Sequence, residues 1–300
     1  MILSQLKGKD TKLTTSKIKS YLTPQWLLTF AILFLAVITG ISSAGFFENK
    51  GAAILTLLSV IYVFIQGAKR YSWKSIIIFL CLAFVFGNLY ENMSIATGFP
   101  FGNYYYTSSL GPKLIYTPIF INVAYFQMAY ITWNLSSALL GSYSNKLKGT
   151  LIFIQPIIAS FLMILWDIVI DPWSSTISHA WRWENGGAYF GVPFSNYLGW
   201  FLCVFSIFFS FAIYTYYFQK DEITDIVKTG NYWVQLIIIY NSWLVLIIIR
   251  ALNTSILQKV FDLGGQYWLT KQLYEVGALF GLCSMVPLSL LCLFNFQKTK

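Results

Sequence analysis

The sequence predicts an all-α fold, a polytopic transmembrane helix bundle of about eight spans, with seven also possible. Of the 300 residues, 57% are hydrophobic and only 10% are charged, whereas soluble domains carry roughly 25% charged residues. Apolar stretches recur along the whole chain. Their length is close to the roughly 20 residues that a helix needs to cross a bilayer. We therefore expect a single integral-membrane domain over residues 24–296.

The spans are assigned to the apolar stretches in chain order. They cover residues 24–46, 51–68, 75–94, 114–141, 149–171, 194–218, 232–253 and 273–296. Residues 1–23 are polar and lysine-rich and have no signal-peptide pattern, so we expect a cytoplasmic basic tail there and a short cytoplasmic tail at 297–300. The loops 95–113 and 172–193 are longer than plain connectors and rich in aromatic residues, so we expect them to be functional outer loops.

The basic residues lie mostly on one side of these spans. If the N-terminus is cytoplasmic, most of the 20 lysine and arginine residues fall on the cytoplasmic side, as the positive-inside rule requires. This bias predicts a multi-pass protein of the cell (cytoplasmic) membrane with both termini inside. It also accounts for the net charge of +9, so we expect no nucleic-acid partner.

Two aspartates stand at the end of the fifth span, in the stretch WDIVIDPW. Asp167 and Asp171 are four residues apart and so share one helix face, and Pro172 is expected to end that helix. Charged groups in a bilayer normally face the bundle interior or a water-filled cavity. Two neighbouring carboxyl groups in a poor dielectric resist ionising together, so we expect one to keep a proton and donate it. The alternative is that Asp171 reaches interface water and Asp167 pairs with Arg250 or Arg182.

A third carboxyl group lies in NLYENMSIATGFPFGNYYY, where an apolar helix meets a loop rich in glycine and tyrosine. Glu91 is either an interfacial glutamate or a third acid that faces the aspartates. Asn88, about one turn earlier, is placed to hydrogen-bond it. Because all three acids fall in the outer half of the predicted bundle, the sequence predicts an acidic site there with Asp167, Asp171 and Glu91 as catalytic residues.

The stretch HAWRWENGGAYFGVPFSNYLGW is rich in aromatic residues. One explanation is the aromatic belt found at membrane interfaces. The other is a cavity in which aromatic faces stabilise a cation beside an acid. The only histidine, His179, has no neighbours at metal-ligand spacing, so we expect no metal site and no cofactor. The candidate substrate-binding residues are Trp166, Trp173, Trp183, Tyr189, Tyr105, Asn196, Asn88, His179, Arg250 and Glu184.

The blocks ENMSIATGFPFGNYYYTSSLGPKLIYTPIF and LWDIVIDPWSSTISHAWRWENGGAYFGVPFSNYLGW resemble the membrane carotenoid-biosynthesis family that includes bisanhydrobacterioruberin hydratase and the carotenoid 1,2-hydratases of the CruF type. The resemblance covers roughly residues 85–205, and its most specific part is WDxxxDPW followed by GGAYFGVPxSNxLGW. It implies a lyase that adds water across the terminal C1=C2 bond of an acyclic (ψ) carotenoid end group, giving a tertiary 1-hydroxy group on the way to a xanthophyll.

The implied partners are membrane lipid and an acyclic or monocyclic carotenoid, such as γ-carotene, lycopene or bisanhydrobacterioruberin. The basic composition is unlike that of a halophile and favours γ-carotene. Under the resemblance, one aspartate is the acid, and the other carboxylate or Glu91 orients water. Trp166, Trp173 and Tyr189 shield the cation. Two other classes stay open: a magnesium-dependent UbiA-like membrane prenyltransferase that uses the DxxxD spacing, and a non-enzymatic lipid- or pigment-binding membrane protein.

Overall fold

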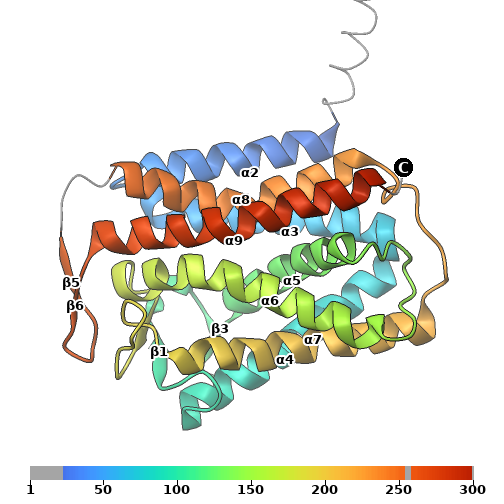
Figure 1. The fold of residues 1–300 in the computed structure, drawn as a ribbon. Helices are drawn as coiled ribbons and strands as arrows, with labels where there is room; N and C mark the ends of the chain where they lie inside the picture. Colours follow the sequence, from blue (N-terminus) through green and yellow to red (C-terminus); the bar gives the residue numbers. More distant parts are fainter. Residues whose placement is uncertain (1–22, 254–257, 299–300) are drawn as a thin grey trace, which may run out of the picture.

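Eight long helices form a bundle in the computed structural model, which describes residues 23–253 and 258–298 (Figure 1). They are α2 (Pro24–Ile41), α3 (Phe46–Tyr71), α4 (Trp73–Thr97), α5 (Ile119–Leu139), α6 (Leu151–Pro172), α7 (Phe194–Phe218), α8 (Gly230–Asn253) and α9 (Thr270–Lys298). The loops carry β1 (Tyr104–Tyr106), η1 (Ser108–Leu110), β2 (Lys113–Leu114), β3 (Thr117–Pro118), η2 (Trp173–Ile177), β4 (Trp181–Trp183), β5 (Lys259–Phe261) and β6 (Tyr267–Leu269). The predicted all-α bundle is confirmed.

Among the described residues, seven helices are long and apolar enough to cross a membrane. The eighth, α5, has 21 residues but is less apolar, because buried amides such as Gln127 and Asn134 interrupt it. The helix is buried without interruption from Tyr125 to Ala138 and packs against α3, α4, α6, α8 and α9. Polar side chains are tolerated in a bundle interior that lipid does not reach. The chain is thus a multi-pass membrane protein with a polar central helix.

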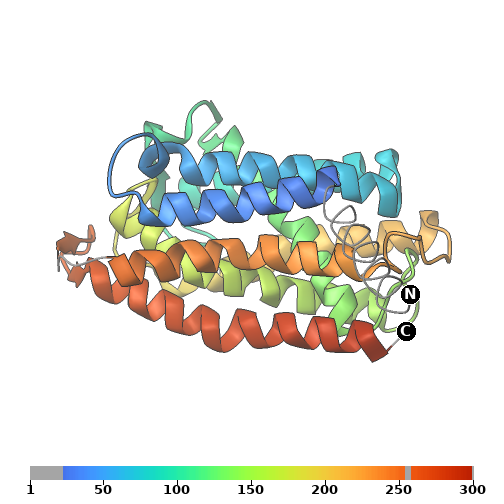
Figure 2. The same ribbon diagram turned by 90° about the horizontal axis from the view of Figure 1, so that it is seen from above.

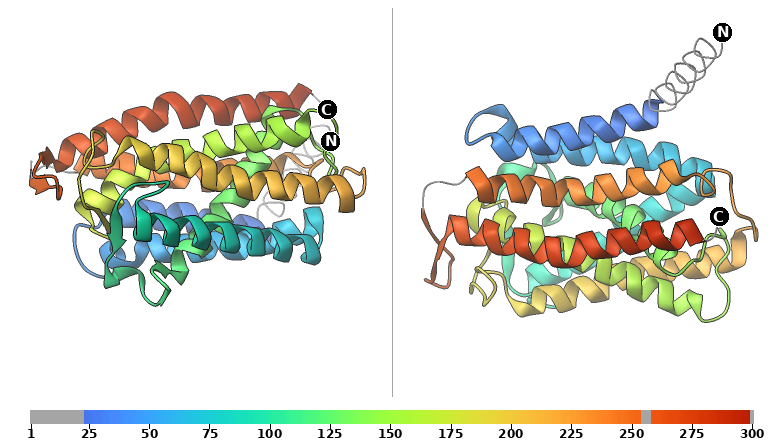
Figure 3. Two further views of the ribbon diagram at one scale, coloured as in Figure 1. Left: turned by 90° about the horizontal axis from the view of Figure 1, so that it is seen from below. Right: turned by 45° about the horizontal axis from the view of Figure 1, so that its top comes forward.

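The two ends of the bundle differ in their connections (Figures 1 and 2). At the end that we call the terminal end, α2 begins, α9 ends, and no strand occurs among the described residues. At the opposite end, which we call the strand end, β1 to β6 lie in the longer loops. On one side of the bundle α8 lies between α2 and α9 (Figure 3).

The predicted tails fall largely outside the described residues. Of the N-terminal tail only Thr23 is described, as the residue before α2. Residues 297–298 of the predicted C-terminal tail continue α9 instead.

The two loops predicted to be functional are joined by a short antiparallel ladder. Strand β1 pairs with β4, with Tyr104 opposite Trp183 and Tyr106 opposite Trp181. Side chains alternate across a strand, so Tyr104 and Tyr106 are buried on one face while Tyr105 is exposed on the other. The pleat therefore determines which tyrosines face the protein interior.

The loop before β1 is held against the start of α7. Ser195 Oγ donates a hydrogen bond to the Phe101 carbonyl oxygen (2.8 Å). A Cβ atom on Gly199 would lie 2.7 Å from the Phe101 ring, closer than real Cβ contacts allow, so glycine permits this close packing. These contacts hold the loop that leads into β1 against the start of α7.

A third loop at the strand end, not singled out by the sequence, forms the β5–β6 hairpin. Its Trp268 ring packs against Phe190, with ring centroids 5.3 Å apart. Arg182 donates to the Phe261 carbonyl oxygen (3.3 Å). The hairpin therefore covers the loop that carries β4.

Candidate active site

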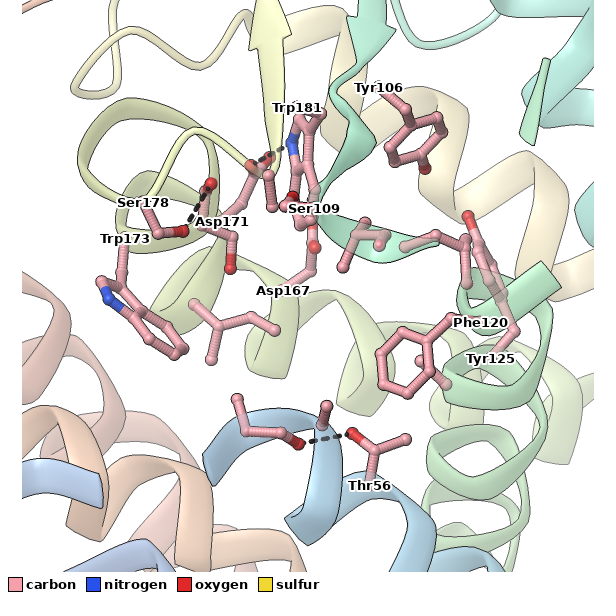
Figure 4. Close-up of a pocket in the computed structure, with 18 of the residues that line it drawn as sticks. Thr56, Tyr106, Ser109, Phe120, Tyr125, Asp167, Asp171, Trp173, Ser178 and Trp181 are labelled. Carbon is pink, nitrogen blue, oxygen red and sulfur yellow. Dashed lines mark hydrogen bonds between the residues drawn. The ribbon is translucent and has the colours of Figure 1, made fainter. Parts of the chain in front are cut away.

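A cavity of about 340 Å³ lies at the strand end and is lined by residues of α3 to α8, β1 and β4 (Figure 4). In Figure 4, Asp167 and Asp171 of α6 lie on one side of the hollow, and Thr56 of α3 and Phe120 of α5 lie across it. All three carboxyl groups that the sequence marks as catalytic, those of Glu91, Asp167 and Asp171, line the cavity. Each residue is at most 3% exposed. The structure therefore brings the three acids to one hollow.

The two aspartates share one amide group. Asn196 Nδ2, near the start of α7, donates to Asp171 Oδ2 (2.8 Å) and to Asp167 Oδ2 (3.1 Å). Trp181 Nε1, on β4, donates to Asp171 Oδ1 (2.9 Å). Asp171 thus accepts hydrogen bonds from two residues, and Asp167 accepts one.

The alternative ion pairs for Asp167 do not form. Arg250 pairs with Glu48, and its Nη2 also donates to the Thr39 carbonyl oxygen (2.9 Å). Arg182 contacts the β5–β6 hairpin instead. Asp167 therefore makes no ion pair within the described part of the chain.

Pro172 does not stop the helix as expected. After Pro172 the chain continues into η2, a π-helical turn, in which Ser178 N donates to the Trp173 carbonyl oxygen (2.8 Å). Ser175 Oγ donates to the Asp171 carbonyl oxygen (2.8 Å), a side-chain bond to the backbone four residues earlier. The wider turn carries Trp173 to the cavity wall.

Glu91 is held by three tyrosine hydroxyl groups. Tyr104 and Tyr106 of β1 donate to Glu91 Oε2, the latter at 2.8 Å, and Tyr125 of α5 donates to Oε1 at 2.8 Å. Burial, followed by the negative charge of Glu91, raises the pKa of Tyr104 and of Tyr106 well above the usual value of 10.0. Both hydroxyl groups therefore remain donors at any physiological pH. No pattern in the sequence predicts these three partners of Glu91.

Asn88, the partner expected for Glu91, has a different neighbour. Its side-chain oxygen accepts a hydrogen bond from Asn92 Nδ2 (3.0 Å), and its carbonyl oxygen accepts another from the same atom (2.7 Å). Asn88 does not line the cavity. The prediction that it binds Glu91 is wrong: among the described residues, the side-chain partners of Glu91 are the three tyrosines.

The cavity walls are aromatic. Three predicted tryptophans line it, Trp166, Trp173 and Trp183, together with three that were not proposed as binding residues: Trp181, Trp200 and Trp243. The rings pack on one another: the Trp200 ring stacks on Tyr125 with centroids 4.7 Å apart, and Trp166 meets Trp243 edge-on at 5.6 Å.

Several of these rings also offer free donors. Within the described residues, three buried indole N–H groups of the lining, those of Trp166, Trp173 and Trp243, have no hydrogen-bond partner. Buried donors normally bind ordered water when no protein group is near. The walls can therefore stabilise positive charge with their faces and bind water with their edges.

The other candidates lie outside the cavity. Tyr105 points away from it on the exposed face of β1, and Glu184 is exposed. His179 Nδ1 lies 3.2 Å from the Ser175 carbonyl oxygen, and its backbone is in the left-handed region (φ 53°). Tyr189 packs against Tyr197 with ring centroids 6.0 Å apart. Tyr189 does not line the cavity. Burial and the nearby Asp171 raise the pKa of Tyr189 to about 12.

Exposed polar residues also line the cavity, and in Figure 4 Ser109 and Ser178 lie beside the aspartates. Lys50, Ser109 and Ser178 are exposed, and Glu48, the partner of Arg250, is half-buried. We call these four residues the polar mouth. Arg250 does not line the cavity itself and contacts its lining through Glu48.

Fold and cavity together define a multi-pass membrane protein with a buried, acidic, aromatic-walled site near one end of its bundle. Within the described residues, no group of three or more His, Cys, Asp and Glu side chains is placed to hold a metal ion. The chain belongs to the carotenoid biosynthesis protein family, whose sequence model matches residues 51–263. The resemblance noted in the sequence is thereby confirmed.

One relative gives a more specific likeness. The chain is 31% identical over 113 residues to a bisanhydrobacterioruberin hydratase from Haloarcula japonica. The aligned stretch is 37% of this chain and spans about a third, 36%, of that relative. No solved structure matches the chain.

Proposed function

We propose that this protein is a carotenoid 1,2-hydratase, a hydro-lyase that adds water to the terminal C1=C2 bond of an acyclic carotenoid end group. Its family is that of carotenoid biosynthesis proteins, and the relative from Haloarcula japonica is named a hydratase. The observation that carries the proposal is the convergence of three buried carboxyl groups on one aromatic-walled cavity.

The chemistry requires an acid, a shielded cation and an acceptor for a proton. A protonated carboxyl group of the aspartate pair transfers its proton to C2, and the π electrons form the new C–H bond. The positive charge then lies on C1, a tertiary carbon, where indole and phenol faces stabilise it. Water attacks C1, and its proton passes to a carboxylate, so that the product gains one molecule of water and nothing is oxidised or reduced.

The cavity suits one end of a long apolar substrate. Its volume lies at the lower end of the roughly 300–1,000 Å³ of small-molecule pockets, and a carotenoid is much longer, so most of the polyene remains among the helices or in lipid. The polar mouth gives water a route from the strand end to the acids. Substrate and water thus reach the site from different surroundings.

Expression in a bacterium that accumulates lycopene or γ-carotene tests the proposal. We expect a pigment that is heavier by one water and has an unchanged visible spectrum, because the attacked bond lies outside the conjugated chain. We expect γ-carotene to be accepted. A prenyltransferase would instead add an isoprenoid mass in a reaction that a chelator stops, and a binding protein would leave pigment masses unchanged; either result removes the proposal.

A further inference from the structure

The hydrogen bonds in the cavity indicate how charge is divided among the three acids. Glu91 accepts three hydroxyl donors, from Tyr104, Tyr106 and Tyr125. Hydrogen bonds that a carboxylate accepts favour its ionised form, and those to a charged group are the stronger ones. These three donors therefore favour the negative charge on Glu91.

The aspartates differ in the same respect. Asp171 accepts from Trp181 and from Asn196, one donor on each oxygen. Asp167 accepts only the longer bond from Asn196, and among the described residues nothing donates to its Oδ1. Both residues are at most 2% exposed, so their protein donors strongly influence which of them ionises. The larger number of donors favours the negative charge on Asp171 and the proton on Asp167.

One cation of the described residues, Lys50, lines the cavity, but it is exposed at the polar mouth and forms no ion pair with the three acids. The buried Arg250 is committed to Glu48, and none of the three acids forms an ion pair in the described chain. A cavity with excess negative charge and aromatic walls resembles the aromatic cages that bind quaternary ammonium groups. Its electrostatic complement is a ligand that carries one diffuse positive charge on an apolar tail.

We propose that the cavity binds protonated tertiary amines with an isoprenoid tail, with Asp171 and Glu91 as the counter-charges and Asp167 as the neutral proton donor. This inference deepens the proposed hydration and rests on it for the identity of the tail. The ammonium nitrogen takes the place of the tertiary cation at C1. Tight binding follows because a catalytic site is complementary to the charge that develops during reaction.

The test is calorimetric titration of the full chain in lipid nanodiscs, with empty nanodiscs as the blank. The probe is N,N-dimethylfarnesylamine, and farnesyl methyl ether is its neutral match. We expect the amine to bind at least about tenfold more tightly than the ether. Asp171→Asn and Glu91→Gln should each lower the amine affinity by about tenfold, whereas Asp167→Asn should leave it within about threefold. Glu275→Gln, at the half-exposed start of α9, should change nothing.

Equal affinity of the wild-type protein for both probes would overturn the inference. So would an Asp167→Asn variant that loses as much amine affinity as Asp171→Asn, since the charge would then lie on Asp167. Ether binding reports intact folding. If Asp171→Asn binds neither probe, Glu91→Gln is compared with Asp167→Asn instead. A loss of amine affinity in Asp167→Asn as large as that in Glu91→Gln would overturn the inference. Because binding needs no turnover, a protein that binds the amine but hydrates no carotenoid contradicts only the proposed function.

Discussion

Each end of the bundle buries a charged side chain whose hydrogen-bond partners are neutral, but only one of these side chains faces a cavity. At the terminal end, Arg70 is 1% exposed, donates to Asn134 Oδ1 and to Ser137 Oγ (3.0 Å), and lies 4.9 Å from the Tyr71 ring centroid and 5.5 Å from that of Trp233. At the strand end, Glu91 is held by tyrosine hydroxyl groups in the same manner.

The difference lies in what surrounds the charge. Packed groups from α3, α5 and α8 enclose Arg70, and Asn145 Nδ2 caps its carbonyl oxygen (2.6 Å). Glu91 lines a hollow that also holds two aspartates. A buried charge surrounded by packed neutral partners ties helices together, whereas the same arrangement beside a cavity can meet a ligand. Burial and charge alone therefore do not identify a reactive site.

The largest effect should come from the aspartate assigned as the acid. Asp167→Asn keeps the shape of the side chain but has no acidic proton, so we expect hydration to fall by about 10²- to 10⁴-fold, the usual contribution of a general acid. Asp171→Asn should also lose most activity. Hydrated pigment per folded protein, measured by mass spectrometry, gives the result.

Asp221→Asn, the same replacement at the exposed terminal end, is the matched control. It should keep wild-type turnover. Near-normal hydration by both Asp167→Asn and Asp171→Asn would show that neither aspartate is the acid. The strand end would then differ from the terminal end in structure but not in function.

The next effect should be on stability alone. Arg70→Met retains most of the side-chain volume but leaves Ser137 Oγ without its donor and Asn134 Oδ1 with only the Tyr232 hydroxyl group (2.8 Å), so we expect the free energy of unfolding to fall by about 1–3 kcal/mol. Thermal unfolding in detergent measures this as a lower Tm, and hydration per folded molecule should be unchanged. A loss of turnover in the folded fraction would contradict a purely structural role for the terminal end.

A smaller effect should separate the two faces of β1. Tyr106→Phe removes one of three donors from Glu91, and a lost hydrogen bond to a charged group of about 1.4 kcal/mol corresponds to about a tenfold slower reaction. Tyr105→Phe alters the exposed neighbour on the same strand and should have no effect. Pigment conversion by the two variants measures the difference. An equal loss of conversion in both variants would mean that the buried and exposed faces of β1 do not differ in their effect on the reaction.

Some of this arrangement could be predicted from the sequence, and the reasons are physical. Apolar stretches of membrane-spanning length predicted the bundle, and the four-residue spacing of Asp167 and Asp171 predicted one shared helix face. Their side in the predicted topology placed both near Glu91. These features depend on the local sequence or on the number of spans, so they can be predicted without knowing how the helices pack.

Other features depend on contacts between distant segments. The inward direction of Tyr104 and Tyr106, in place of Tyr105, is set by the register of β1 against β4. The turn after Pro172 depends on backbone contacts of η2. The β5–β6 hairpin packs on residues far away in sequence. None of these leaves a pattern within one segment. The catalytic roles of the acids stay predictions.

The smallest effect should be that of the exposed ion pair between Lys148 and Asp221 at the terminal end on the Tm. Lys148 and Ser144 hydrogen-bond Asp221, and the Lys148 ammonium group chiefly lowers the pKa of that carboxyl below its usual 3.8. A lowered acid pKa favours the folded state above the usual pKa, and this contribution disappears as the pH falls through the folded value. The pair is thus fully formed at neutral pH, yet both side chains are more than half exposed, so solvent and salt screen it. Lys148→Met should therefore leave the Tm unchanged at physiological salt, in contrast to Arg70→Met. A clear fall in Tm would show that charge, and not burial among packed partners, makes the terminal end rigid.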